Sequence, residues 1–224
     1  MLEEKLRNRE FAEIFHFQLH AGNTLVIDLS KSNPDPALKK LKNTQDLEDY
    51  IQDLLDNNQK DYAVGGYGED RVIYRRFPHF SPDSENERSV HLGIDIWCPS
   101  GEAVHCPMEA SVHSIGNNDA PGDYGGTVIL SHEMDGDYFH TLYGHLSYHS
   151  IKNLTPGDKL KPAESFATIG ERSENVDWPT HLHFQIIRDL EGHEGDYPGV
   201  CNPSKREHFL KNCPDPNLIL GLEV

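Results

Sequence analysis

The sequence is poor in positive charge. Its 224 residues include 20 lysines and arginines against 37 aspartates and glutamates, which gives a formal net charge of −17. A field of that sign repels phosphate backbones and anionic lipid surfaces. We therefore expect neither a nucleic-acid partner nor a membrane partner, and we interpret the acidic excess chiefly as a source of solubility.

Long apolar runs are also lacking, and no stretch approaches the roughly 20 residues of a membrane span. The N-terminus, Met1-Leu-Glu-Glu-Lys-Leu-Arg-Asn-Arg-Glu10, is charged throughout. It has no apolar core of about 7–15 residues, which an export signal needs. These features predict a cytoplasmic protein, and a secreted protein is the alternative if a leader has been removed.

Cysteine is scarce, and none of the four falls into a CxxC pair. They are Cys98, Cys106, Cys201 and Cys213. This spacing excludes the short-spaced structural zinc pattern, although two disulfides remain possible. Without an export signal, free thiols are the expected state.

Residues 1–75 predict a small α+β lead-in of unknown role. Between Thr44 and Asp56 the apolar residues recur at i, i+3, i+4, i+7 and i+8, which places them on one face of a helix. Thr44 is the expected N-cap. Ahead of this helix, residues 23–30 have the composition of a short strand.

From residue 76 to residue 224 the pattern changes to short β-type runs separated by Gly, Pro, Asn and Asp. The predicted strands are residues 93–97, 103–106, 110–115, 127–131, 138–143, 166–169 and 181–187. Such spacing, with little helix between the runs, favours a mainly β domain with an antiparallel sheet. The length allows this main domain and one smaller appendage.

Histidine is unusually abundant, with 14 copies. Most have no neighbour at ligand spacing, and for these we predict surface or core roles. They are His16, His20, His79, His105, His113, His132, His140, His149, His193 and His208. The remaining four stand in patterns that bear on chemistry.

His181-Leu-His183 lies in a β-type run. Residues i and i+2 of a strand point to the same face about 6.6 Å apart, so both imidazoles project from one surface. One of them can bind a metal while the other reaches a water. Leu182 and Phe184 point the opposite way, toward a core. Two solvent-facing histidines remain the alternative interpretation.

His91-Leu-Gly-Ile-Asp95 supplies a second cluster. In a fully extended chain its ends would lie about 13 Å apart, so the backbone must turn for both to reach one ion. We expect Gly93 to permit this turn, because glycine adopts conformations closed to other residues. With His183, one imidazole and one carboxylate complete a three-ligand set suited to Zn²⁺. His145, at the end of another predicted strand, is weak evidence by itself.

Taken in order, His91-x-x-x-Asp95, Tyr143-x-His145-Leu and His181-x-His183-Phe resemble the lysostaphin-type zinc metallopeptidases, which cut peptide cross-links in bacterial cell walls. The resemblance covers about residues 88–188 and implies a β-rich, barrel-sandwich-like fold with its site on the floor of a groove. It implies one Zn²⁺ ion held by His91, Asp95 and His183. His145 and His181 would be catalytic histidines that do not bind the metal.

The implied function is a zinc-dependent metalloendopeptidase that hydrolyses a peptide bond in peptidoglycan-type or other small peptides. One catalytic histidine would take a proton from water, an effect worth on the order of 10²–10⁴ in rate. The segment Glu174-Asn-Val-Asp-Trp-Pro-Thr180 departs from the family's glycine-rich approach to the last histidines. We expect this departure to change the groove wall and the peptide that the site admits.

Two other functions are compatible with parts of the pattern. A non-catalytic zinc-binding or regulatory module on the same scaffold would keep the ligands without hydrolysis. A phosphohistidine carrier resembling the sugar phosphotransferase enzyme IIA also uses a His-x-Gly-x-Asp stretch, but it leaves His181-x-His183 unexplained. The sequence predicts no oligomeric state.

Overall fold

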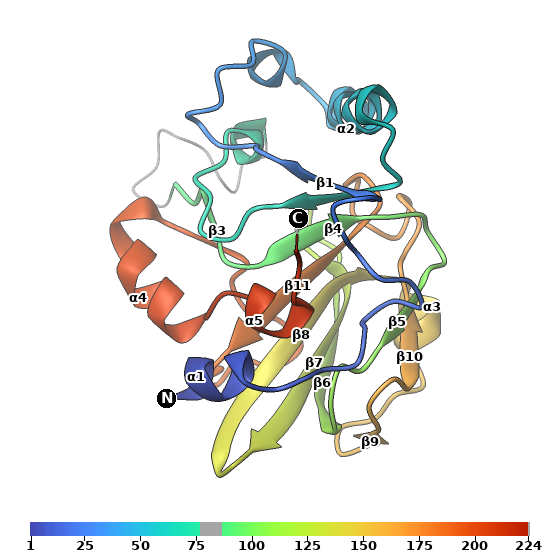
Figure 1. The fold of residues 1–224 in the computed structure, drawn as a ribbon, viewed down its shortest axis with the longest axis vertical. Helices are drawn as coiled ribbons and strands as arrows, with labels where there is room; N and C mark the ends of the chain where they lie inside the picture. Colours follow the sequence, from blue (N-terminus) through green and yellow to red (C-terminus); the bar gives the residue numbers. More distant parts are fainter. Residues whose placement is uncertain (77–86, 224) are drawn as a thin grey trace.

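The structure is a computed structural model that describes residues 1–76 and 87–223. The fold is mainly β, as predicted (Figure 1). His79, for which we predicted no ligand role, lies outside the described residues. None of the described helices has the length and apolar character that crossing a membrane requires.

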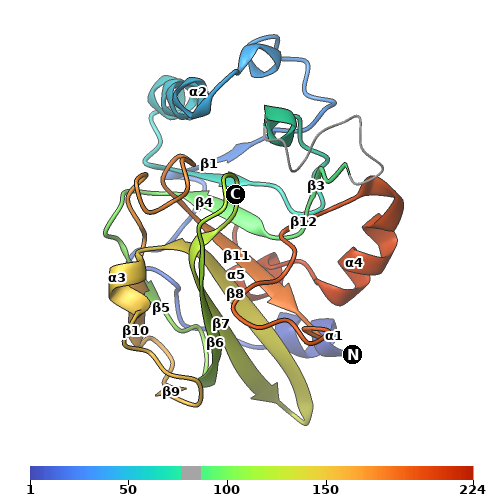
Figure 2. The same cartoon turned by 180° about the vertical axis from the view of Figure 1, so that it is seen from behind.

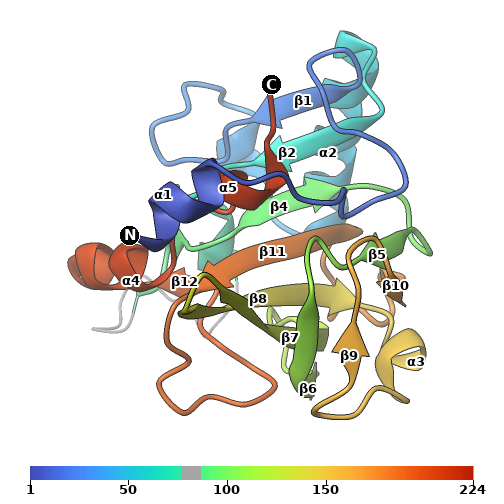
Figure 3. The ribbon, with the colours of Figure 1, turned by 60° about the horizontal axis from the view of Figure 1, so that its bottom comes forward.

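An eight-stranded mixed sheet forms the centre of the molecule. Its order is β1 (Thr24–Ile27), β2 (Tyr62–Gly65), β4 (Ile94–Trp97), β11 (His181–Ile187), β8 (Asp137–Leu146), β7 (Gly125–Met134), β6 (Ala110–Asn118) and β9 (Lys159–Leu160). Neighbours pair antiparallel except β1 and β2, which are parallel. Figure 3 shows this succession from β1 to β6.

Two small sheets and short helices surround the centre. The sheets pair β3 (Val90–His91) with β12 (Val200–Cys201), and β5 (Ala103–His105) with β10 (Ser165–Thr168). The α-helices are α1 (Leu2–Arg7), α2 (Thr44–Asn58), α3 (Tyr148–Ile151), α4 (Arg206–Asn212) and α5 (Asn217–Leu220). One-turn 3₁₀ segments cover Leu38–Lys40, Ile73–Arg76 and Pro203–Lys205. Helix α2 lies beyond β1 and β2, and α1 lies beside α5 (Figures 1 and 2).

The longest strands, β7 and β8, form a hairpin that exceeds its predicted bounds. Its tip is Asp135-Gly136, and both residues have positive φ angles, 51° and 81°. This is the backbone of a type I′ turn, whose twist matches that of the flanking strands. The turn therefore lets the ladder run up to the tip, where Met134 pairs with Asp137.

Helix α2 covers the predicted segment, but it begins at Thr44 itself and its cap is the preceding residue. Asn43 has an extended backbone, and its side chain accepts a hydrogen bond from the Asp46 amide at 3.0 Å. The prediction of Thr44 as N-cap was therefore wrong. Thr44 is the first helical residue, and its hydroxyl instead donates to the Asp177 carbonyl at 2.5 Å.

The lead-in and the main β region share one sheet and one core. Strand β2 pairs with β4, and Gly65 lies opposite Asp95. The apolar face of α2 belongs to a cluster that also contains two tryptophans of the main β region, and its members include Leu47, Ile51, Leu55, Trp97 and Trp178. The predicted division at residues 75 and 76 stays a prediction.

Strand β11 alternates as its sequence predicts. Leu182 and Phe184 belong to the largest apolar cluster, together with residues of β7, β8 and β10. His181 and His183 therefore emerge on the other face of the sheet. All seven residues of β11 are buried, so this face is covered as well.

The four cysteines are buried free thiols, and burial raises the pKa of Cys98 and of Cys106 to about 12.

Candidate metal centre

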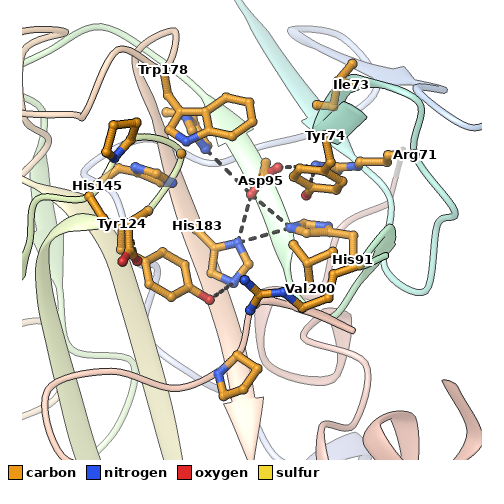
Figure 4. A pocket seen from close by; sticks show the side chains of 18 of the residues that line it. Arg71, Ile73, Tyr74, His91, Asp95, Tyr124, His145, Trp178, His183 and Val200 are labelled. Carbon is orange, nitrogen blue, oxygen red and sulfur yellow. Dashed lines mark hydrogen bonds and ion pairs between the residues drawn. The ribbon is translucent and has the colours of Figure 1, made fainter. Parts of the chain in front are cut away.

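Three side chains on neighbouring strands meet at one point. His183 of β11 lies directly opposite Asp95 of β4, and His91 ends β3. His183 Nδ1 lies 3.0 Å from Asp95 Oδ1 and 3.0 Å from His91 Nε2, and the latter lies 3.2 Å from Asp95 Oδ1. Figure 4 shows the three groups turned toward one another. Within residues 1–76 and 87–223, they are the one such group of His, Cys, Asp or Glu.

Gly93 brings His91 and Asp95 together, but for a different reason from the predicted one. The chain bends at Gly93 between β3 and β4, and its φ is outside the left-handed region. A Cβ at this position would lie 2.6 Å from His183 Cε1 and 2.7 Å from the Phe184 carbonyl oxygen. The prediction of a conformational requirement was wrong, because glycine is needed here for space.

The outer nitrogen of each imidazole is held by a carbonyl-type oxygen. His91 Nδ1 donates to the Gly66 carbonyl at 3.0 Å, and His183 Nε2 donates to Gln185 Oε1 at 2.9 Å. The Gln185 amide is oriented in turn, because its nitrogen donates to the Pro198 carbonyl at 3.3 Å. Such outer partners set the tautomer of a ligating histidine. The inner nitrogens are left with lone pairs.

Three lone pairs therefore face one another at His91, Asp95 and His183. Burial, followed by the nearby Arg71 charge, lowers the pKa of His91 to about 4, so this ring is neutral at pH 7. Burial alone would raise the pKa of Asp95, but the charged Arg71 guanidinium beside it helps to hold that pKa well below its ordinary value. Lone pairs at such distances repel one another unless a cation lies among them.

The spacing of the three atoms fits Zn²⁺. Four ligands at zinc–ligand distances of about 2.0–2.1 Å in a tetrahedron lie about 3.3 Å from one another. The observed separations of 3.0, 3.0 and 3.2 Å are close to this edge length. Two imidazoles and one carboxylate are also a donor set that zinc accepts, and three ligands leave a fourth position open.

Arg71 is a site residue that the sequence did not reveal. Its side chain is 1% exposed, and Nη1 donates to Asp95 Oδ2 at 2.5 Å while Nε donates to Glu69 Oε2 at 2.7 Å. One oxygen of Asp95 is thereby held by Arg71, and the other faces the two histidines. No local pattern marks Arg71, because its partner lies 24 residues further along the chain.

His181 and His145 stand beside this group. His181 Nδ1 donates to the Pro179 carbonyl at 2.7 Å, so its Nε2 has a lone pair, 3.8 Å from Asp95 Oδ1. The His145 and His181 rings lie 4.1 Å apart, centroid to centroid. Burial lowers the pKa of both, and in His145 the neighbouring His181 contributes as well. Both rings are therefore neutral at pH 7.

The backbone of His145 is strained. Its φ of 64° is uncommon for a residue with a Cβ, and its amide donates to the Tyr124 carbonyl at 2.8 Å, which helps to hold this conformation. Among the described residues, its Nδ1 has no hydrogen-bond partner. Strain of this kind concentrates at functional sites.

All five predicted site residues line one pocket of about 300 Å³. Its other lining residues come from several segments and include Leu47, Arg71, Tyr74, Arg88, Trp97, Asp123, Tyr124, Trp178, Asp196, Tyr197 and Val200. The sequence marked the segment of Trp178 but no other part of this wall. The structure thus brings the five residues together, and their individual roles stay predictions.

Comparison with known protein families gives a match that covers these site residues. The family model described as Peptidase family M23 matches residues 89–196, which confirms the resemblance predicted from the motifs. No curated protein matches the chain.

Similar solved structures include a zinc-containing peptidase from Vibrio cholerae, with 22% identity over 44% of this chain and 27% of that one, and a TM-score of 0.37. Helicobacter pylori Csd3 has 22% identity over 55% of this chain and 32% of that one, with a TM-score of 0.34. Lysostaphin has 21% identity over 54% of this chain and 44% of that one, with a TM-score of 0.38. The chain spans about a third or less of the first two proteins.

Proposed function

We propose that this chain, whose residues 89–196 match peptidase family M23, is a zinc-dependent metallopeptidase. The observation that carries the proposal is the convergence of three lone pairs, from His91 Nε2, Asp95 Oδ1 and His183 Nδ1, within 3.2 Å of one another. These three residues would hold one Zn²⁺ ion. When bound there, zinc supplies Lewis-acid catalysis, since it polarises a carbonyl oxygen and lowers the pKa of water.

His181 is proposed to accept the proton of the attacking water. Its Nδ1–H is committed to the Pro179 carbonyl, so Nε2 is the atom that receives the proton. A neutral imidazole is the protonation state that a general base requires. The fixed tautomer supports this role, because the lone pair faces the site before the substrate arrives.

His145 is proposed to donate a hydrogen bond to the oxyanion that develops on the substrate. It lies against His181, and its strained backbone keeps it at the pocket wall. Donors that are oriented before the reaction stabilise developing charge without reorganisation. The two histidines would thus divide proton acceptance and oxyanion stabilisation.

Arg71 is proposed to orient the carboxylate. It holds Asp95 Oδ2, so Oδ1 remains the atom presented to the ion. Partners of this kind are worth about 10–100-fold in metal affinity. The lead-in would in this way contribute to the metal centre, through Arg71 and through the Gly66 carbonyl that orients His91.

Zinc titration by calorimetry, paired with a hydrolysis assay, tests the proposal. Wild-type protein stripped with chelator should bind one equivalent of zinc and should then cleave members of a peptide panel that includes glycine-rich and D-amino-acid peptides. The His183→Ala variant should do neither. Stoichiometric zinc binding without cleavage of any peptide would instead favour a non-catalytic zinc module.

A further inference from the structure

We propose that the substrate of this site is a free di- or tripeptide rather than an internal bond of a long peptide strand. The proposal rests on the metallopeptidase function proposed above and names its substrate class. It follows from how deep the reacting groups lie, which residues form the walls of the pocket and how much space those walls leave.

The reacting groups lie deep. His91, Asp95, His145, His181 and His183 are each 5% exposed or less. They are reached through a pocket of about 300 Å³.

Trp178 forms a roof over the two proposed catalytic histidines. Its ring centroid lies 6.3 Å from that of His181 and 6.5 Å from that of His145. The edge of the roof is closed by Tyr74, which meets Trp178 edge to face at 6.0 Å. In Figure 4, Trp178 lies above and to the left of Asp95, and Tyr74 lies to its right. Both rings are 6% exposed or less, so they are packed parts of the pocket wall rather than surface groups.

The lead-in fixes this roof in place. The Thr44 hydroxyl of α2 donates to the Asp177 carbonyl at 2.5 Å, and Arg172 reaches back to Gln45 at 2.8 Å. Leu47 of the same helix shares an apolar cluster with Trp178. The loop also turns sharply, since Val176 and Asp177 have φ angles of 42° and 65°. Such a conformation persists where surrounding contacts hold it, and α2 supplies them.

The opposite wall is closed by close contact between two segments. Tyr124 is 8% exposed, and its hydroxyl lies 3.4 Å from His183 Nε2. A Cβ added at Gly199 would lie 1.9 Å from that hydroxyl oxygen, so the chain at Gly199 runs directly against the tyrosine. Tyr197 and Val200 extend the same wall. The described residues thus bound the site on two opposite sides.

The volume fits a very small peptide. A cavity of about 150 Å³ holds one benzene, so about 300 Å³ corresponds to roughly 12 non-hydrogen atoms. Small di- and tripeptides have about that number. Charges of both signs also line the pocket, from Arg88, Asp123 and Asp196. A free peptide carries an ammonium and a carboxylate that match such a lining, whereas an internal segment of a strand carries neither.

The test compares matched substrates on the zinc-loaded full chain. Free glycyl and alanyl di- and tripeptides are set against N-acetylated, C-amidated decapeptides of the same residues, with products identified by mass spectrometry. We expect kcat/KM to be at least about 100-fold higher for the free short peptides, a discrimination within the range that built sites achieve. Equal or faster cleavage of the capped decapeptides would overturn the proposal. Cleavage of no peptide at all would overturn the proposed function itself.

Opening the roof provides a second test. Trp178→Ala should raise the ratio of decapeptide to tripeptide cleavage about tenfold or more, because it removes the ring that blocks the longer chain. Thr44→Ala removes only the hydroxyl that holds Asp177 and should raise the ratio less. Gln52→Ala, on the exposed face of α2, is the matched control and should leave the ratio unchanged. An unchanged ratio in either folded roof variant, verified by thermal unfolding, would contradict the proposal.

Discussion

Two groups of buried or half-buried histidines differ in what surrounds them. At the metal centre, defined by His91, Asp95 and His183, ring nitrogens point at one another and at a carboxylate. On β6 and on the β7–β8 hairpin, His113, His132 and His140 form a sheet cluster. There each ring has a hydroxyl within hydrogen-bond distance, at 2.8 Å from Ser114, 2.7 Å from Thr141 and 3.0 Å from Ser131 respectively.

The difference lies in the kind of partner. A hydroxyl can donate to a histidine lone pair and so satisfies it. A second imidazole lone pair or a carboxylate cannot donate, so the lone pairs at the metal centre remain unsatisfied until a cation joins them. Burial is common to both groups, because it lowers the pKa of His132 and of His91 alike to about 4. Convergence on a carboxylate, rather than burial, therefore separates a candidate metal site from a structural histidine.

The largest expected effect comes from breaking the convergence itself. His183→Ala removes one of the three converging atoms and should abolish peptide hydrolysis, because too few protein ligands remain for tight zinc binding. The matched change in the sheet cluster, His132→Gln, should keep wild-type kcat/KM. Steady-state kinetics on both variants measures the contrast, and residual turnover in His183→Ala above one part in about 10³ would contradict it.

The next effect separates proton transfer from metal binding. His181→Gln should keep zinc but lower kcat by about 10²–10⁴, the usual contribution of a general base. His140→Gln in the sheet cluster should leave kcat unchanged. Calorimetric zinc titration and single-turnover kinetics on the same samples distinguish the two roles. Loss of zinc in His181→Gln would mean that His181 binds the metal.

A smaller effect is expected at Arg71. Replacement by Met leaves the buried carboxylates of Glu69 and Asp95 without their cation, so zinc affinity should fall by about 10–100-fold. Breaking a buried ion pair also costs about 3–5 kcal/mol of the free energy of unfolding. Arg172→Met is the control, because Arg172 forms a half-exposed ion pair with Glu48, and it should cost far less of the free energy of unfolding. Zinc affinity in Arg71→Met equal to that of wild type would exclude the orienting role.

Substitutions in the sheet cluster should have the smallest effect on peptide hydrolysis. They should instead change how the free energy of unfolding depends on pH. Burial holds the pKa of His132 at about 4, below its ordinary 6.5, so the unfolded chain takes up this proton first. Stability should therefore fall as the pH drops from about 6.5 to about 4. His132→Gln should reduce that loss by on the order of 2 kcal/mol. Urea unfolding at pH 7 and pH 4.5 checks this, and equal losses in both proteins would contradict it.

The sequence predicted the elements whose pattern is local. Strand β11 has its predicted bounds, since alternation alone places His181 and His183 on one face and Leu182 on the other. The grouping of His91, Asp95 and His183 followed from motif order. Features that depend on distant contacts escaped prediction. Arg71 donates a hydrogen bond to the carboxylate of Asp95, 24 residues further along the chain. The loop that carries Trp178 is held by helix α2, more than 100 residues earlier.

Gly93 shows most clearly which structural causes cannot be predicted from the sequence. The motif predicts that glycine is necessary at this position, but for a reason that is wrong, because the crowding comes from His183 and Phe184, about 90 residues away in the chain. Side-chain space is a property of packing between strands, and neither composition nor local spacing encodes it.

Zinc X-ray absorption spectroscopy on protein purified without chelator identifies the ligand atoms themselves. We predict one zinc per chain, with only nitrogen and oxygen neighbours at about 2.0–2.2 Å. Sulfur neighbours at about 2.3 Å would instead place the ion on the cysteines. That result would contradict the assignment of His91, Asp95 and His183 as its ligands.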